Sequence, residues 1–265
     1  MNPSFSSPTT NLLDEALGIG RTGSVPWRIA LVQDCVEASG AFLLHHLLKR
    51  SLSAEAAGAV VFLGLAQPFS HYDRVLRKMG CNLSLQRNKN KLHFIDLLDL
   101  EFLVAGGTDQ NAIEDGFMNL YNRILRFIEA NNLMHNNGGW IRIIIDDISL
   151  LEIAAQGSSS HTFDFLQYCA TLTSELDCSL LILNHGDIYS SEEDQRLLSH
   201  LDYLSDVVIK AETLSTGIAV DVHGQLTIIN KRALGELGWS SSKVYNFQFK
   251  LKENAVEFFY PGTKF

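Results

Sequence analysis

The chain has 265 residues, 46% of them hydrophobic, and its 30 acidic residues against 21 basic ones give a formal net charge of −9. This length allows one large α/β domain or two small ones, and the apolar content excludes an intrinsically disordered chain. The acidic balance excludes a global attraction to nucleic acid, so any RNA or DNA contact needs a local basic patch or a more basic partner.

Residues 1–26 are rich in Ser, Thr, Gly and Pro, and we expect them to form an arm ahead of one folded domain over residues 27–265. The first residues contain neither a basic nor a long apolar segment, which argues against a secretory leader. Apolar runs such as residues 59–66 are too short to span a bilayer. Without an export signal, the four scattered cysteines are expected to be reduced, buried thiols in the cytosol or nucleus: Cys35, Cys81, Cys169 and Cys178.

Short apolar runs alternate with longer helical patterns over the first two thirds of the chain. We predict strands at residues 27–32, 59–66, 92–97, 141–145 and 180–183, and helices at residues 40–52, 69–79, 113–128 and 162–176. Strands that alternate with helices form right-handed βαβ units, and both faces of the resulting sheet are buried. The expected fold class is therefore α/β, with a central, mostly parallel sheet flanked by helices.

The pattern changes toward the C-terminus, where strand-like runs follow one another without helices between them. These runs are residues 207–210, 217–222, 226–230, 244–251 and 255–259. His223-Gly224 and Glu253-Asn254 supply residues typical of turns. The C-terminal part is therefore predicted to be an antiparallel meander that extends the same sheet.

A parallel sheet with this order of elements invites comparison with P-loop ATPases. In those proteins the first strand leads into the loop GxxxxGK[ST], whose N–H groups and lysine hold phosphate and whose hydroxyl binds magnesium. If Gly40 takes the second glycine position, Cys35 replaces the first glycine, Ala41 the lysine and Phe42 the hydroxyl residue. Glu37 adds negative charge near the expected phosphate position. We therefore predict a RecA-like, P-loop NTPase-type fold in which the Walker A loop is absent.

Two pairs of polar residues follow predicted strands. Asp146 and Asp147 follow residues 141–145, as the acid of a Walker B strand does, but an Asp there also caps the next helix. Because the P-loop lysine is missing, we favour the capping interpretation. Asn184-His185-Gly186-Asp187 follows residues 180–183 at the edge where α/β sheets place ligands. A turn stabilised by Asn and Asp is the favoured interpretation of that segment.

The other candidate residues have structural interpretations. His45 and His46 lie within the predicted helix 40–52 and are interpreted as packing residues or as part of a solvated edge rather than as metal ligands. The one basic cluster covers a predicted helix end and the following loop, and we favour a solvated face over nucleic-acid contact: Arg74, Arg77, Lys78, Arg87, Lys89 and Lys91. The predicted loop after residues 180–183 is acidic, which argues against tight binding of phosphate. It contains four acidic residues and one basic residue: Asp187, Glu192, Glu193, Asp194 and Arg196.

Four segments, taken in their order and spacing, resemble the family of subunit 6 of the Elongator complex. The segments are Pro68-Phe69-Ser70-His71-Tyr72, Ile145-Asp146-Asp147, Asp164-Phe165-Leu166-Gln167-Tyr168-Cys169 and Asp221-Val222-His223-Gly224-Gln225-Leu226. The resemblance extends from about residue 27 to residue 260, nearly the whole chain. It implies a RecA-like fold without a P-loop, in agreement with the pattern above.

The resemblance also implies a role. It implies a non-catalytic structural subunit that joins subunits 4 and 5 in a hetero-hexameric ring and docks on the catalytic subcomplex of subunits 1, 2 and 3. The ring would assist tRNA binding and release while the wobble uridine (U34) is modified at C5. The radical and acetyl chemistry would reside in subunit 3. On this interpretation the chain has no catalytic, cofactor-binding or metal-binding residue, needs no cofactor, and is found in the cytoplasm, with or without a nuclear pool.

Two alternative functions stay open at this point. A RecA-like recombination accessory protein that binds DNA would share the fold, and salt-sensitive DNA binding by the isolated chain would favour it. An enzyme with an unusual nucleotide pocket would depend on Asp146 and Asp147. ATP turnover that is abolished by Asp146→Ala would favour that second alternative.

Overall fold

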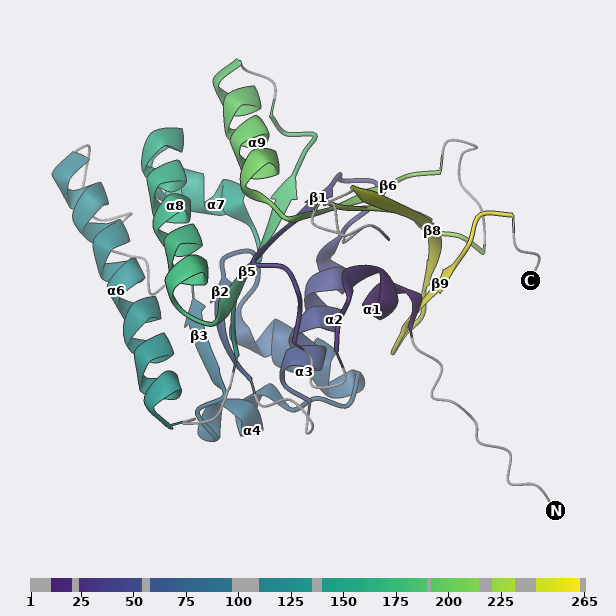
Figure 1. Cartoon of the computed structure of the whole chain (residues 1–265), viewed down its shortest axis with the longest axis horizontal. Coiled ribbons are helices and arrows are strands. Elements are labelled where there is room, and N and C mark those ends of the chain that lie inside the picture. Colours follow the sequence, from purple (N-terminus) through teal and green to yellow (C-terminus); the bar gives the residue numbers. More distant parts are fainter. Residues whose placement is uncertain are drawn as a thin grey trace, which may run out of the picture.

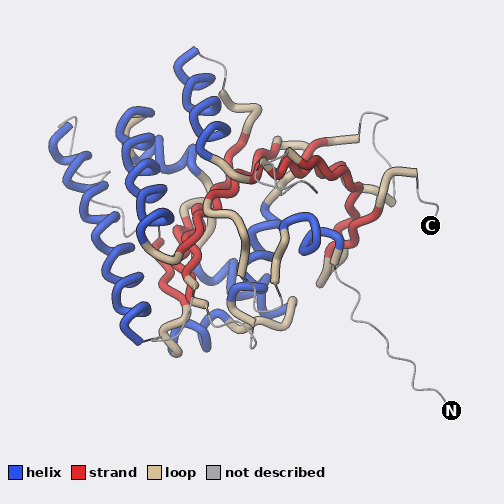
Figure 2. Tube along the Cα trace, viewed as in Figure 1, coloured by secondary structure: helices blue, strands red, loops and turns tan. Residues whose placement is uncertain are grey.

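The computed structural model describes residues 11–20, 24–53, 58–96, 110–134, 140–189, 192–214, 221–231 and 242–262. A nine-stranded sheet lies at its centre, with the spatial order β3-β2-β4-β5-β1-β6-β7-β8-β9. Helices cover both faces of the parallel part of this sheet (Figure 1), and Figure 2 shows the strands running between the two helical layers. The α/β class and the RecA-like arrangement expected from the sequence are confirmed.

The first six strands in spatial order pair in parallel. They are β1 (Ile29–Asp34), β2 (Ala59–Gly64), β3 (Leu92–Asp96), β4 (Ile141–Ile145), β5 (Cys178–His185) and β6 (Val207–Glu212). Each predicted parallel strand is present, but β1 begins and ends two residues later than expected and β5 extends two residues further at its carboxyl end. These shifts place Asp34 and His185 inside the sheet rather than in loops.

Two hydrophobic clusters fill the space on either side of the sheet. One face is covered by α6 (Gln110–Met134), α7 (Ile148–Ala154), α8 (Ser159–Glu175) and α9 (Glu192–Leu204). The other is covered by α1 (Leu12–Leu17), α2 (Ala41–Ser51), α3 (Phe69–Lys78) and α4 (Leu83–Asn88). Successive strand residues alternate between the clusters, as in Leu31 and Val32, and this explains the continuous apolar runs. None of the described helices combines the length and apolarity that a membrane span needs.

The C-terminal strands form the predicted antiparallel meander. They are β7 (Gly224–Asn230), β8 (Lys243–Leu251) and β9 (Val256–Phe259). The turn at Glu253-Asn254 is confirmed, because it joins β8 to β9. Of the strand predicted at residues 217–222, residues 217–220 lie outside the described residues, and Asp221 and Val222 are not in a strand.

The turn predicted at His223-Gly224 is wrong. Gly224 is the first residue of β7 and pairs with Phe249. A Cβ at this position would lie 2.7 Å from the Glu212 carbonyl oxygen and 2.8 Å from the Phe249 ring. A glycine is therefore needed there for the close approach of neighbouring strands and not for a turn.

Part of the predicted N-terminal arm belongs to the folded body. Residues Leu12–Leu17 form α1, and the side chains of Leu13 and Leu17 are fully buried. The Asp14 carboxylate lies 2.7 Å from Nε2 of His46 on α2. A polar composition suggested a loose arm, but two leucines one turn apart were enough to anchor a short helix to the core. The first ten residues lie outside the described residues.

Candidate functional site

Four polar side chains meet at the carboxyl edge of the central strands. Asp34 ends β1, His185 ends β5, and Asp146 and Asp147 directly follow β4. These strands are neighbours in the order β4-β5-β1, and Asp34 is the register partner of His185. In RecA-like folds this edge is where nucleotide would bind, so it is the candidate site.

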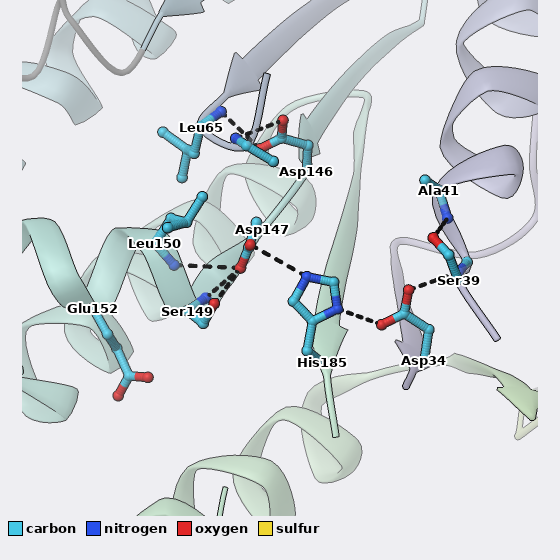
Figure 3. A network of polar contacts seen from close by, with 12 residues as sticks. Asp34, Ser39, Ala41, Leu65, Asp146, Asp147, Ser149, Leu150, Glu152 and His185 are labelled. Atoms are coloured by element: carbon cyan, nitrogen blue, oxygen red, sulfur yellow. Dashed lines mark hydrogen bonds and ion pairs between the residues drawn. The ribbon is translucent and has the colours of Figure 1, made fainter. Parts of the chain in front are cut away.

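His185 bridges two carboxylates. Its Nδ1 lies 2.5 Å from Oδ1 of Asp34, and its Nε2 lies 3.3 Å from Oδ2 of Asp147 (Figure 3). The hydrogen bond with Asp147, followed by the one with Asp34, raises the pKa of His185 to about 10. At neutral pH both ring nitrogens therefore carry protons and donate. The site holds one cation between two carboxylates whose side chains are only 1% and 7% exposed.

The N-terminus of α2 is occupied by the protein's own carboxylate. Oδ2 of Asp34 accepts a hydrogen bond from the Gly40 N–H at 2.6 Å, and the Ser39 hydroxyl accepts one from the Ala41 N–H at 3.3 Å. This is the position at which a P-loop presents its N–H groups to phosphate. A Cβ at Gly40 would lie 2.8 Å from Cγ1 of Val32, so the backbone is packed tightly against β1 here. The Asp34 carboxylate thus occupies the position at which a P-loop binds a phosphate group.

The loop between β1 and α2 closes into a tight turn. Cys35 and Ala38 form an isolated antiparallel bridge, and the Ala38 N–H donates to the Cys35 carbonyl oxygen at 3.0 Å. The N–H of Val36 is bound by Oδ2 of Asp187 at 2.9 Å. These two backbone donors therefore point at protein acceptors rather than at a common centre where phosphate could lie.

Phe42, at the position of the magnesium-binding hydroxyl residue, packs against the C-terminal meander. Phe42 is buried, and its ring centroid lies 4.7 Å from that of Phe249 on β8. This contact attaches α2 to the antiparallel meander. The residues at the Walker A positions are instead used for packing and for internal hydrogen bonds.

Asp147 is a helix cap, as the favoured interpretation proposed. Its Oδ1 accepts hydrogen bonds from the N–H groups of Ser149 at 2.8 Å and Leu150 at 3.3 Å, at the start of α7. Burial raises the pKa of Asp147, but hydrogen bonds from His185 and Ser149 outweigh burial, so that the pKa lies below its ordinary value. The carboxylate is therefore ionised at neutral pH and pairs with the imidazolium.

Asp146 has a different structural role from Asp147. It is 2% exposed and accepts hydrogen bonds from the N–H groups of Leu65 at 2.8 Å and Ala66 at 3.1 Å, and from the Tyr72 hydroxyl. Burial raises the pKa of Asp146 to about 6, and burial together with the Asp146 charge raises that of Tyr72. In Figure 3 Asp146 turns toward Leu65 and away from His185. Asp146 therefore connects β4 to the β2–α3 segment and does not cap α7.

The histidines of α2 contact the neighbouring helices α3 and α1. His45 is largely buried, and this burial lowers its pKa to about 4. Its ring lies 5.8 Å from the ring of Tyr72, while His46 binds Asp14 of α1. Within the described ranges, no group of three His, Cys, Asp or Glu side chains is arranged to hold a metal ion.

The predicted charged loops are partly helical. Arg87 lies in α4, which was not predicted, and its guanidinium carbon lies 5.5 Å from the centroid of the Phe69 ring. Arg77 pairs with Asp73 at 2.6 Å. On the acidic side, three residues of the predicted loop lie at the start of α9: Glu192, Glu193 and Asp194.

Exposed aliphatic side chains lie on the segments that follow the three strands of the candidate site, β1, β4 and β5. Val36 is 81% exposed, Ile153 is 69% exposed and Ile188 is 49% exposed. Hydrogen bonds hold their segments together, because Val36 is bound by the β5–α9 connection and the Tyr189 hydroxyl donates to Glu152 at 3.1 Å. A site whose charged groups are bound to one another, next to an apolar rim of Val36, Ile153 and Ile188, is suited to contact with another protein surface.

The role of His185 was not predicted from the sequence, because Asn and Asp on either side of it favoured a turn. Asp34 and His185 are 151 positions apart in the chain. The only available signal was that each follows a run of buried strand residues, and the strand order is needed to see that the two strands are neighbours.

Comparisons with known proteins agree on one family. The family model described as Elongation complex protein 6 matches residues 12–253. The chain is similar to Elongator complex protein 6 of Xenopus laevis, with 31% identity over 94% of this chain and 96% of the relative. It is also similar to the Homo sapiens protein of that name, with 30% identity over 85% of this chain and 88% of the relative.

A solved structure supports the fold independently. The chain superposes on a KaiC-like protein from the hyperthermophilic archaeon Pyrococcus horikoshii OT3 with a TM-score of 0.62, covering 94% of this chain and 95% of the other. The sequence identity is only 13%, so this likeness concerns the fold alone.

Proposed function

The chain belongs to the Elongator complex protein 6 family, and from this premise we propose that it is a non-catalytic structural subunit of an Elongator complex. It forms a hetero-hexameric ring of RecA-like subunits with subunits 4 and 5. That ring docks on the catalytic subcomplex of subunits 1, 2 and 3 and assists tRNA binding and release during C5 modification of the wobble uridine (U34). The protein acts in the cytoplasm, with or without a nuclear pool.

One observation carries the non-catalytic part of this proposal: the Asp34–His185–Asp147 network fills the carboxyl edge. A phosphate group at this edge would meet two buried carboxylates. A like charge about 4 Å from one of them costs about 4 kcal/mol at an effective dielectric of 20. The sequence supplies no P-loop lysine to offset this cost, and the only cation of the network is already bound on both sides.

The apolar rim supports the subunit role. Val36, Ile153 and Ile188 lie on the segments that follow β1, β4 and β5 and are exposed in the isolated chain. We place a contact with a neighbouring subunit on this rim, where the burial of the three side chains would contribute roughly 1 kcal/mol or more each.

The ring is tested by the native mass and partner list of the complex captured from cells. The proposal expects this chain together with two different partners of the same fold. Recovery of the chain as a lone monomer or a homo-oligomer would contradict it.

The rim is tested by a charge introduced into the apolar surface. Ile188→Asp should reduce the amount of both partners that co-purify, and Val36→Asp should act in the same direction. Leu85→Asp is the matched control, because Leu85 is 47% exposed on α4, away from the rim. If the rim variants and Leu85→Asp recover the two partners in equal amounts, the rim is not part of the contact between subunits.

A further inference from the structure

Helices α6 and α8 lie side by side in the outer layer of one face (Figure 1), and a cavity of about 170 Å³ opens between them. At about 30 Å³ per water molecule, this volume corresponds to between five and six waters, or one long side chain. The cavity lies outside the Asp34–His185–Asp147 network, so an inference about it stands independently of the proposed function.

Aromatic rings from both helices form the floor and wall of the cavity. Phe117 of α6 and Phe165 of α8 are 6% and 1% exposed, and their ring centroids are 5.2 Å apart. About one helical turn further along α6 and α8, the ring centroids of Tyr121 and Tyr168 are 5.8 Å apart. Tyr168 is 53% exposed, although a tyrosine at a closed helix interface would be covered. The floor is therefore apolar, and an aromatic face remains accessible at the opening.

Two carboxylates complete the lining, one from each helix. Glu114 precedes Phe117 on α6, and Asp164 precedes Tyr168 by one helical turn on α8. Among the residues that the structure describes, no Lys or Arg lines the cavity, and neither carboxylate forms an ion pair. His161 also lies in the lining, where its Nδ1 contacts the Ser158 hydroxyl at 2.6 Å.

We propose that this cavity is a binding site for an arginine side chain presented by a partner protein. A planar guanidinium stacks on tyrosine faces within about 6 Å, is more weakly hydrated than an ammonium, and donates in a fork that matches carboxylate oxygens. The cavity offers all three features: accessible rings, an apolar floor and carboxylates at the opening. A purely apolar side chain would leave Glu114 and Asp164 without partners, and a nucleic-acid segment would bring phosphate close to both.

A set of matched short peptides tests the site on the full chain. The probe is acetyl-Gly-Leu-Arg-Leu-Gly-amide, compared by calorimetry with peptides in which citrulline or lysine replaces the arginine. Citrulline keeps the shape of arginine and removes its charge. The arginine peptide should bind with a Kd of about 1 mM or tighter, and citrulline should weaken binding about tenfold. The affinity of the lysine peptide should lie between those of the arginine and citrulline peptides.

Isosteric variants locate the binding site. Asp164→Asn and Glu114→Gln should each weaken binding of the arginine peptide several-fold, and Tyr168→Ala about tenfold. Glu129→Gln, also exposed on α6 but not in the lining, is the matched control and should bind as the unmodified chain does. Thermal melts of each variant establish that it is folded.

Three results would overturn the proposal. The first is equal binding of the arginine and citrulline peptides. The second is no binding of the arginine peptide at concentrations up to about 10 mM. The third is binding of a single-stranded RNA oligonucleotide that is lost in Tyr168→Ala while the arginine peptide is unaffected, because the rings would then serve base stacking.

Discussion

The two edges of the parallel sheet each hold a side-chain cation, but they stabilise it in opposite ways. At the carboxyl edge, His185 lies between two carboxylates, and its side chain is 32% exposed. Near the amino edge, Arg142 of β4 is fully buried between two indole rings, with its guanidinium carbon 5.2 Å from the Trp27 centroid and 4.8 Å from the Trp140 centroid. One cation is held by opposite charge, and the other by aromatic faces and neutral acceptors.

Helix α2 connects the two arrangements. Its N-terminus donates to the Asp34 carboxylate, while near its last turn Arg142 donates to the Ser51 hydroxyl at 2.5 Å and the Leu47 carbonyl oxygen at 3.5 Å. An anion at the N-terminus and a cation at the C-terminus both favour the helix dipole. The position at which a P-loop would bind phosphate is therefore one of two places where α2 is bound to the strands of the sheet by a charged side chain.

The largest effect is expected at the amino edge, because the cation there is completely buried. Arg142→Ala should reduce the free energy of unfolding by about 3–5 kcal/mol, since it removes packing and leaves buried acceptors without a donor. Burial lowers the pKa of Arg142 to about 9, so the side chain is charged at neutral pH. Urea denaturation measures the loss, and a change below about 1 kcal/mol would contradict the structural role.

Arg142→Lys separates charge from shape at the same position. Lysine keeps the positive charge but lacks the planar group that lies between Trp27 and Trp140. We expect it to recover only about half of the loss. Full recovery would mean that charge at the end of α2 is sufficient.

Asp146→Ala should have the next largest effect, about 2–4 kcal/mol. The substitution leaves two backbone N–H groups and the Tyr72 hydroxyl buried without an acceptor. Asp146→Asn should cost less because one oxygen remains, and Tyr72→Phe should cost about 1–2 kcal/mol. Urea denaturation of the three variants gives this order, and an Asp146→Ala change as small as that of Tyr72→Phe would contradict it.

His185→Gln should reduce stability by a smaller amount, about 1–2 kcal/mol, because the group is partly exposed to solvent. Its effect depends on pH. The pKa of His185 is raised from 6.5 to about 10 in the folded state, so its contribution is complete below pH 6.5 and is lost as the pH rises toward 10. The difference in melting temperature between the unmodified chain and His185→Gln should therefore shrink from pH 6.5 to pH 10. A constant difference would show that the ion pairs contribute nothing.

The smallest change in stability is expected for Ala41→Lys, which restores only the missing lysine. Ala41 is half-buried at the first position of α2, and such a substitution changes stability by about 0.5 kcal/mol. No nucleotide affinity should appear, because Asp34 still accepts the Gly40 N–H. Binding of a fluorescent ATP analogue by this variant would contradict the prediction. It would show that phosphate can displace the contacts of the Asp34–His185–Asp147 network.

The sequence predicted the parallel sheet, the meander and the cap at Asp147, because each depends on local patterns that the tertiary structure reinforces. It failed where neighbours are distant in the chain. The role of His185 follows only from the adjacency of β5 and β1, and that of Tyr72 only from the adjacency of β4 and β2. Helix α1 was missed because its six residues are embedded in a polar segment, and its packing against the core decides its conformation.

The most direct test is a calorimetric titration of the purified chain with magnesium ATP. Because the Asp34–His185–Asp147 network fills the carboxyl edge and leaves an excess of negative charge there, we expect no saturable heat at ATP concentrations up to about 1 mM. Saturable binding with a Kd below about 100 μM, lost in Asp146→Ala, would contradict the account, as would a crystal structure with a triphosphate seated against Ser39 and Gly40.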